Sequence, residues 1–472
     1  MGFNDILTKI NDVMYTYILV ILLVGVGIYF TIRTRGVQFR LLGDGIKSMM
    51  KKTEKTENGE KKVSSFQALM ISTASRVGTG NIAGIATAIA AGGPGAVLWM
   101  WLMALIGGAS AFIESTLAQI YKIKEGGQYR GGPSYYMERA LGKRWMGILF
   151  SILLIICFAY GFNGLQSYNM SSALEYYIAD YSNTIWPMVL GTVLAVATGL
   201  VIWGGTHRIG FISSVIVPVM AIIYILLGLV TMVLNIKELP EMFAIIFENA
   251  FDVKAIMGGF AGSAVVIGIK RGLFSNEAGM GSAPNASASA DVDHPVKQGL
   301  VQIISVFIDT ILICSSTAIM LLVSGVEGKS GTLDGIPYVQ AAISSNVGEW
   351  GIHFITFSIF AFAFSSLIGN YFYAESNILF IKNSKVLLNI FRVTCVVAIF
   401  LGAQADFSLV WNLADITMGL MAIVNIIAIF LLGKIAIKCL KNYEKQKKAG
   451  ENPVFYEDEI GLYGTVWKRD RK

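Results

Sequence analysis

The sequence predicts an all-α polytopic membrane protein. Hydrophobic residues make up 54% of its 472 positions and charged residues only 14%, whereas a soluble domain carries about 25% charged residues. The apolar residues fall into eleven segments, each near the length of about 20 residues that crosses a membrane as a helix. Two of these segments are interrupted in their middles by glycine and polar residues, and these interruptions direct the search for a site.

The eleven predicted segments are joined mostly by short loops. They run over residues 14–33, 66–91, 95–122, 145–179, 186–203, 211–235, 255–290, 297–324, 350–381, 385–403 and 408–433. The segments at 145–179 and 350–381 are longer than one bilayer thickness, so they must tilt or extend beyond the membrane. Residues 336–346, between the eighth and ninth segments, are expected to form a short outer surface helix.

Basic residues between the segments predict the orientation. Residues 33–63 contain nine lysine and arginine residues, and short loops rich in these residues face the cytoplasm. The amino terminus is therefore expected outside the cell and the carboxyl terminus in the cytoplasm, which requires an odd number of crossings. The net charge of +6 indicates topology signalling and contact with anionic membrane lipid, and not nucleic-acid binding.

The second and seventh segments are the interrupted ones. The second contains SRVGTGNIAG (75–84) and the seventh contains GLFSNEAGMGSA (272–283). Glycine adopts backbone angles that end a helix, and backbone freed at membrane depth must be buried in protein or line a wet cavity. Close helix packing through small residues could explain one such cluster. Polar and charged residues beside both clusters favour a binding site.

Four uninterrupted segments follow each interrupted one, which gives two sets of five. Because five is odd, the second set must cross the membrane in the opposite sense. Interrupted helices in corresponding places of two halves indicate the binding site of a secondary transporter. The predicted parts are an extra amino-terminal helix with a basic segment (1–63), a first repeat (64–236), an inverted second repeat (255–433) and a basic cytoplasmic tail (434–472).

Three motifs resemble those of the alanine/glycine:cation symporter family of prokaryotes. They read GGPGAVLWMWLMALIG (92–107), RVGTGNIAGIATAIA (76–90) and RGLFSNEAGMGSAPNASA (271–288). Because that family is part of the amino acid–polyamine–organocation superfamily, the resemblance implies a LeuT-type fold of two inverted five-helix repeats. One extra amino-terminal helix would then account for eleven transmembrane helices.

The resemblance also implies an activity. The expected protein is a sodium-coupled symporter that imports alanine, glycine or both across the inner membrane of a prokaryotic cell by alternating access. The sequence contains no phosphate-binding loop and no catalytic constellation, so neither ATP nor an enzymatic reaction is expected. The alternative is a proton-coupled amino acid transporter of the same fold, for which Asp309 within the eighth segment is the candidate residue.

By this resemblance, the substrate binds at the two interruptions. Backbone N–H groups of Thr79 and Gly80 should hold the substrate carboxylate, because the second half-helix begins there and its amino-terminal end favours an anion. Gln166 could contact the substrate or could equally form an interhelical hydrogen bond. Phe274 and Met280 are expected to limit the substrate side chain. The full set of expected substrate-binding residues is Ser75, Gly78, Thr79, Gly80, Gln166, Phe274, Ser275, Asn276 and Met280.

The resemblance implies sodium ligands as well. Carbonyl groups freed at the first break and hydroxyl groups of the ninth segment should surround the ion, because hard cations prefer oxygen. The expected ligands are Ala74, Val77, Phe362, Ser365 and Ser366, with Asn81 as a weaker candidate. The two serine hydroxyls could instead bond to carbonyl groups of their own helix.

Arg76 stands where members of the superfamily often carry a small residue. This departure leaves open whether a second sodium ion touches the substrate, although Asn81 and Asn276 could supply oxygen atoms for one. A buried ion pair with Glu277 or Glu114 is the other role that the sequence leaves open for Arg76.

Overall fold

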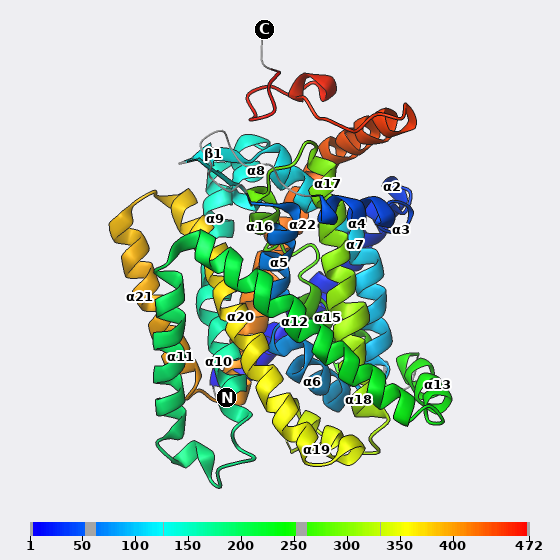
Figure 1. Cartoon of the computed structure of the whole chain (residues 1–472), viewed down its shortest axis with the longest axis vertical. Coiled ribbons are helices and arrows are strands. Elements are labelled where there is room, and N and C mark those ends of the chain that lie inside the picture. The colour runs from blue at the N-terminus through cyan, green and yellow to red at the C-terminus, as the bar shows by residue number, and fades with distance from the viewer. Residues whose placement is uncertain (1–2, 52–62, 126, 252–261, 331, 470–472) are drawn as a thin grey trace.

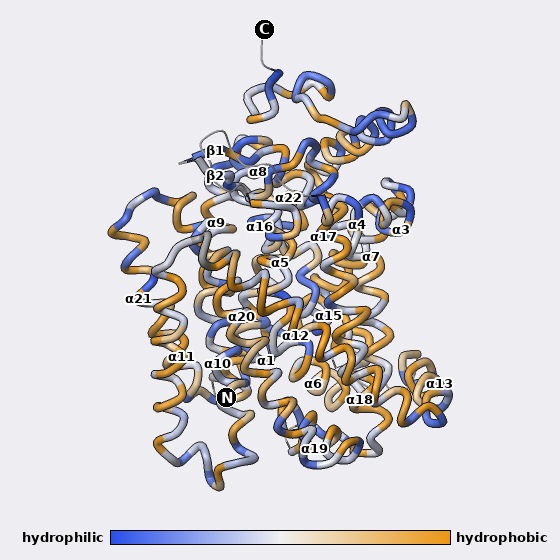
Figure 2. The backbone as a smooth tube through the Cα atoms, in the orientation of Figure 1, coloured by the Kyte–Doolittle hydropathy of each residue, from blue (hydrophilic) through white to orange (hydrophobic). Residues whose placement is uncertain are grey.

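The computed structural model describes residues 3–51, 63–125, 127–251, 262–330 and 332–469. Helices dominate this part of the chain, and one antiparallel hairpin pairs β1 (Ile123–Glu125) with β2 (Gln128–Arg130). The long helices run side by side (Figure 1), and hydrophilic backbone gathers mainly towards the two ends of the molecule (Figure 2). The end that carries α3 (Val37–Arg40), α4 (Leu42–Met50), the hairpin and the carboxyl terminus is called the basic end.

Both predicted interruptions are confirmed. The second segment consists of α5 (Ser65–Arg76), a 3-10 turn (Thr79–Asn81) and α6 (Ala83–Gly92), and the seventh consists of α15 (Ala264–Asn276), a turn and α16 (Pro284–Ser289). The second break begins at Glu277, whose φ of 54° is left-handed, and Gly279 and Gly281 continue it at φ 84° and 88°. Glycine reaches these angles without a steric penalty. The part of the seventh segment at 255–261 lies outside the described residues.

Eight helices in the described part of the chain are long and apolar enough to cross a membrane. They are Asn4–Arg33, Ala96–Ile120, Arg144–Ser172, Phe211–Leu234, Pro295–Leu322, Trp350–Ile381, Lys385–Gly402 and Phe407–Lys448. The apolar helix α11 (Trp186–Ile202) is shorter. The interrupted segments fall outside this group because each of their halves is short, so the total of eleven crossings stays a prediction.

Three predicted segments have different ends in the structure. The first begins at Phe3 and passes through α1 (Phe3–Val13), a π-helical turn and α2 (Val20–Arg33), while the fourth ends at Ser172 and not near residue 179. The last, α22 (Phe407–Lys448), continues into the predicted tail. Lysine, glutamate and glutamine favour helix there, and Ile437, Leu440 and Tyr443 bury one face of it.

The remaining long helices surround the two broken ones. They are α7 (Ala96–Ile120), α9 (Arg144–Leu154) with α10 (Asn163–Ser172), α12 (Gly205–Leu234), α17 (Pro295–Phe307) with α18 (Ser315–Leu322), α20 (Trp350–Ile381) and α21 (Lys385–Gly402). A π-helical stretch joins α9 to α10 and another joins α17 to α18. The helix α7 packs against α15 and α17, and α20 packs against α5 and α10, so unbroken helices enclose both breaks.

Two shorter helices lie at the end opposite the basic end (Figure 1). The predicted helix at 336–346 is confirmed as α19 (Gly335–Val347), and Tyr338 and Val339 are buried on the face that packs on α20. The helix α13 (Leu239–Ala250) was not predicted, because its glutamates interrupt the apolar pattern. Met242 and Ile246 nevertheless bury one of its faces.

Candidate substrate and sodium site

The two breaks meet inside the molecule. Ser75, next to the end of α5, donates a hydrogen bond of 3.0 Å to the carboxylate of Glu277 at the start of the second break. Asn81 Nδ2 lies 3.3 Å from Ser275 Oγ. A Cβ atom placed on Gly80 would lie 2.4 Å from the ring of Phe274. The structure therefore brings residues of the two predicted half-sites into direct contact.

The backbone amides of the first break face α10. The N–H of Thr79 donates to Gln166 Oε1 at 3.0 Å, and Asn169 Nδ2 donates to Thr79 Oγ1 at 2.8 Å. The N–H of Gly78 donates to Asn81 Oδ1 at 3.0 Å. Gln166 therefore makes an interhelical hydrogen bond with the very amide that was predicted to bind a carboxylate. A substrate carboxylate that takes this amide must displace the Gln166 carbonyl.

The predicted sodium ligands from the first break also come together with those of α20. Ser366 Oγ donates to the carbonyl oxygen of Ala74 at 3.0 Å and lies 3.4 Å from the carbonyl oxygen of Val77. A Cβ atom on Gly369, one turn further along α20, would lie 2.7 Å from the backbone nitrogen of Ser75. The glycine thus permits the close approach of α20 to α5 that places the Ser366 hydroxyl at the break.

Ser365 and Phe362 are bonded to each other on α20. Ser365 Oγ donates to the Phe362 carbonyl oxygen at 2.8 Å, and both residues are buried. This is the bond within one helix that the sequence left open as an alternative for the serine pair. The two serines therefore differ, since only the hydroxyl of Ser366 bonds across to the first break.

A buried acid joins the site from the stretch between α17 and α18. Asp309 is fully buried, and its carboxylate accepts hydrogen bonds from Asn81 Nδ2 at 2.6 Å, from Ser275 Oγ at 2.5 Å and from Thr310 Oγ1 at 3.0 Å. These donors are all neutral. Acids buried at membrane depth are costly and usually functional, so this cluster is a second candidate place for a cation or a proton.

The ion pair considered for Arg76 is not formed among the described residues. Its guanidinium donates to Gln302 at 3.2 Å, while Nε and Nη2 have no hydrogen-bond partner there. Both candidate acids have other partners. Glu277 accepts from Ser75 and Ser282, and Glu114 accepts from Asn425 and from a backbone amide of the second break. These donors satisfy the carboxylates, and the Arg76 side chain bonds to α17.

The remaining predicted residues lie at the second break. Asn276 Oδ1 accepts from the N–H of Ala278 at 3.0 Å, which forms an Asx turn just after α15, and its Nδ2 has no partner among the described residues. Met280 is fully buried in the turn. The contact of Ser75 with Asn370 Oδ1 at 2.8 Å was not predicted. The feature of the sequence that could have predicted this contact is the polar residue Asn370 within the apolar ninth segment.

An aromatic and charged stack covers the site on the side away from the basic end. Phe274 packs against Phe162 and Trp411, with ring centroids 4.9 and 5.3 Å apart. The Arg271 guanidinium lies 4.3 Å from the Trp411 ring and makes two hydrogen bonds to the Asp415 carboxylate, of 3.1 and 3.0 Å. The stack links α15 to α22 and closes the breaks from that side.

This chain is similar to known proteins along its length. The model of the sodium:alanine symporter family matches residues 1–457. Amino-acid carrier protein AlsT of Bacillus subtilis is 48% identical, over 100% of this chain and 98% of the relative. Probable sodium/glutamine symporter GlnT of the same organism is also 48% identical, over 97% and 94%. Sodium/alanine symporter AgcS of Methanococcus maripaludis is 35% identical, over 95% and 99%.

A solved structure gives the fold. The crystal structure of MhsT in complex with L-phenylalanine has a TM-score of 0.58 to this chain at 14% sequence identity, over 86% of this chain and 94% of that one. MhsT is a transporter of the LeuT-type fold, so the predicted fold class is confirmed. At this level of identity the likeness concerns the fold alone.

Proposed function

This chain belongs to the sodium:alanine symporter family, and on that premise we propose that it imports a small neutral amino acid together with sodium by alternating access. Members of the family are transporters and not enzymes. The observation that carries the sodium coupling is the position of Ser366. Its hydroxyl touches the carbonyl oxygens of Ala74 and Val77, which the break releases from helix bonding, and such oxygen atoms suit an alkali ion.

Sodium binding at this place would hold together the helices that form the site. The ion accepts lone pairs from the Ala74 and Val77 carbonyls and from the hydroxyl of Ser366, so it fixes α5 against α20. The carbonyl of Phe362 and the hydroxyl of Ser365 complete the proposed ligands once their mutual bond is exchanged for the ion. Asn81 stays the weaker candidate, because its Oδ1 already accepts a hydrogen bond of 3.0 Å from the Gly78 N–H.

The amino acid would bind on the other side of the same break. Its carboxylate displaces the Gln166 side chain from the Thr79 amide. This exchange is favourable because a hydrogen bond to an ionised carboxylate is about twice as strong as one to the neutral carbonyl of Gln166. Its ammonium group is held by carbonyl groups in the last turn of α15, near Phe274 and Ser275. The Phe274 ring lies close against Gly80, and so crowded a site suits a hydrogen or methyl side chain better than a large one, so alanine and glycine are the proposed substrates.

The two parts of the chain then move against each other. The proposed moving bundle consists of α5–α6, α7, α15–α16 and α17–α18, and the remaining long helices form the scaffold. In this proposal residues 64–236 and 255–433 are inverted repeats, and the basic end faces the cytoplasm.

Uptake into proteoliposomes tests the proposal. With an inward sodium gradient, labelled alanine should accumulate, and replacing external sodium by potassium should reduce the initial rate to that of protein-free liposomes. Equal rates in the two media would end the claim of sodium coupling. Thermal stabilisation by a panel of amino acids at fixed sodium concentration, glutamine included, then ranks the substrates.

The buried carboxylate of Asp309 supports proton coupling as the second candidate. Protonation would neutralise it without loss of its place among Asn81 and Ser275. Under this alternative, an imposed inward proton gradient drives alanine uptake without sodium, and Asp309→Asn abolishes that uptake. Persistence of sodium-driven uptake in Asp309→Asn, together with no response to the proton gradient, would exclude it.

A further inference from the structure

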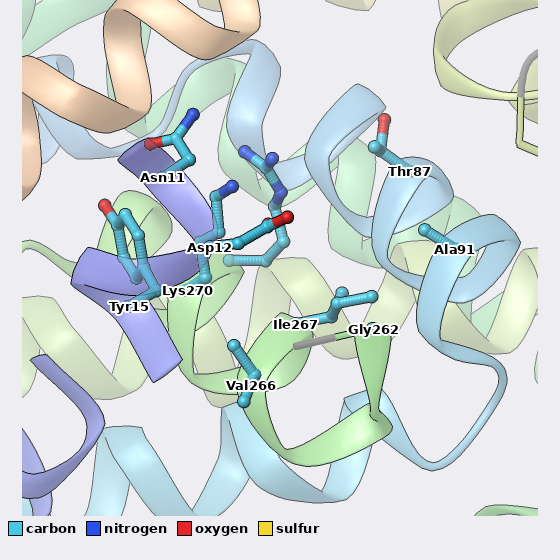
Figure 3. A pocket seen from close by; sticks show the side chains of 10 residues that line it. Asn11, Asp12, Tyr15, Thr87, Ala91, Gly262, Val266, Ile267 and Lys270 are labelled. Carbon is cyan, nitrogen blue, oxygen red and sulfur yellow. The ribbon is translucent and has the colours of Figure 1, made fainter. Parts of the chain in front are cut away.

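A second polar cavity lies outside the site at the breaks. It has a volume of about 250 Å³ and is lined by residues of α1, α6 and α15, among them Asp12, Ala91, Lys270 and Arg271. Figure 3 shows these three elements around it. Asp12 and Ala91 are exposed, so the cavity opens to the surface. Pockets for drug-sized ligands measure about 300–1,000 Å³, so this cavity suits a small ligand.

Charges of both signs lie at the cavity. Lys270 Nζ lies 2.6 Å from Asp415 Oδ2, and Arg271 makes its two hydrogen bonds to the same carboxylate. Asp415 thus serves two bases, and Asp12 is the second acid beside them. Exposed Asp12 lies on the α1 side of the same cavity and interacts with the charge of Lys270. The cavity therefore presents a cation and an anion to one small ligand.

The cavity is also next to the cover of the proposed substrate site. Arg271 lines the cavity and lies over Trp411, which packs on Phe274, and Phe274 closes on Gly80. A ligand that bonds to Lys270 competes with Asp415 and weakens one of the two ion pairs that join α15 to α22. Occupation of the cavity would thereby act on the contact that keeps the breaks covered.

We propose that this cavity is an outer binding site for a free zwitterionic amino acid, with the carboxylate on Lys270 and the ammonium group at Asp12. The proposal rests on the proposed function for its ligand class and for the outward orientation of the cavity. The amino-terminal helix α1 supplies Asp12 and so takes part in the site. Tyr15, three residues further on, fixes α1 there through its hydrogen bond to the carbonyl oxygen of Asp415 and its contact with Lys270.

Protection of a reporter cysteine tests the proposal. The four native cysteines are buried, so Ala91→Cys places a single reactive thiol in the cavity. Its reaction with a membrane-impermeant maleimide is followed in potassium medium without sodium, so that the site at the breaks stays empty of substrate. Alanine at about twice its dissociation constant should slow the reaction about threefold, because the unoccupied fraction is 1/(1 + [L]/Kd).

Three compounds and three variants make the result specific. Acetate carries only the carboxylate and ethylammonium only the ammonium group, so each should protect less than alanine. Lys270→Met should remove the protection by alanine, and Lys270→Arg should retain it. Asp12→Asn should reduce the protection by alanine to the protection that acetate gives. The matched control Lys237→Met removes an exposed lysine that does not line the cavity, and it should leave the protection unchanged.

The outcomes separate this proposal from the proposed function. Absence of protection, protection that survives Lys270→Met, or equal protection by acetate and alanine would overturn the outer site, whatever sodium-driven uptake shows. Protection that depends on Lys270 and Asp12, in a protein whose alanine uptake ignores sodium, would support the outer site and contradict the proposed sodium coupling.

Discussion

Gly78 and Gly80 are the residues whose size matters most to the site. A Cβ atom on Gly78 would lie 2.4 Å from Ser366 Oγ, and one on Gly80 would lie 2.4 Å from the ring of Phe274. Glycine at these positions lets the first break touch both α20 and α15. The proposed sodium ligands and the proposed carboxylate site depend on these two contacts, because each brings a partner helix to the freed backbone.

Gly80→Ala should weaken alanine binding. The added methyl group must push the Phe274 ring away, and overpacking of this kind costs about 1–3 kcal/mol, which corresponds to about five- to hundredfold in affinity at 1.4 kcal/mol per tenfold. Sodium-dependent binding of labelled alanine to the purified protein measures the effect. The matched control is Gly84→Ala, in α6 just after the 3-10 turn that contains Gly80, where the nearest side-chain atom would be 3.7 Å away. Equal affinities of the two variants would contradict the proposed contact.

At the scale of elements, one carboxylate holds the two broken helices together. Glu277 begins the second break, and it accepts hydrogen bonds from Ser75 beside the first break and from Ser282 within the second. It is almost fully buried. The breaks are thereby fixed relative to each other, so a change at one of them is transmitted to the other through a direct contact.

Glu277→Gln should destabilise the protein. The amide retains the shape of the side chain but loses one acceptor oxygen and the charge, and a hydrogen bond to a charged group contributes about 1.5–3 kcal/mol. The midpoint of thermal unfolding in detergent should fall below that of the wild type. Glu349→Gln changes an exposed glutamate and is expected to leave the midpoint unchanged. If Glu277→Gln unfolds at the same temperature as the wild type, the hydrogen bonds of Glu277 do not contribute to the stability of the protein.

The elements could be predicted where a pattern within one short stretch of the sequence indicates them. Glycine and polar residues inside apolar runs located both breaks, and the resemblance to the symporter family, carried over to Ser365 and Ser366, indicated the contact of α20 with the first break. The cluster around Asp309 could be foreseen only as an isolated acid, because it assembles from three separate elements. The role of Arg76 stayed open in the sequence for the same reason. The positive charge of Arg76 suggested an acidic partner. The hydrogen bonds that Glu114 and Glu277 already accept from other groups become apparent only in the structure.

At the scale of the whole molecule, the account requires a fixed orientation in the membrane. The basic end carries α4 and the carboxyl terminus, and α13 and the cavity-lining helix α6 lie away from it (Figure 1). Inward movement of one sodium ion gains about 2.3 kcal/mol per 100 mV of membrane potential, negative inside. That gain favours import, and the basic loops predict that the cover formed by Phe274, Trp411 and Arg271 faces the outside.

Cysteine labelling in intact cells checks this orientation. Lys47→Cys, exposed on α4, should react with a membrane-impermeant maleimide only after the cells are opened, because the basic end is expected in the cytoplasm. Lys237→Cys, exposed just before α13, should react in intact cells. The reverse pattern would place the amino terminus inside and contradict the topology that the basic loops predict.

The coupling of the two cargoes is tested most directly by sodium movement driven by alanine. Proteoliposomes are given equal sodium concentrations on both sides, with a trace of radioactive sodium outside, a clamped membrane potential and an inward alanine gradient. The account predicts that wild-type protein accumulates the isotope and that Ser365→Ala and Ser366→Ala, each of which removes a proposed ligand, take it up more slowly, with the larger loss in Ser366→Ala because its hydroxyl contacts the first break. Alanine entry through the wild-type protein with no accumulation of sodium would contradict the claim that both bind at one broken helix.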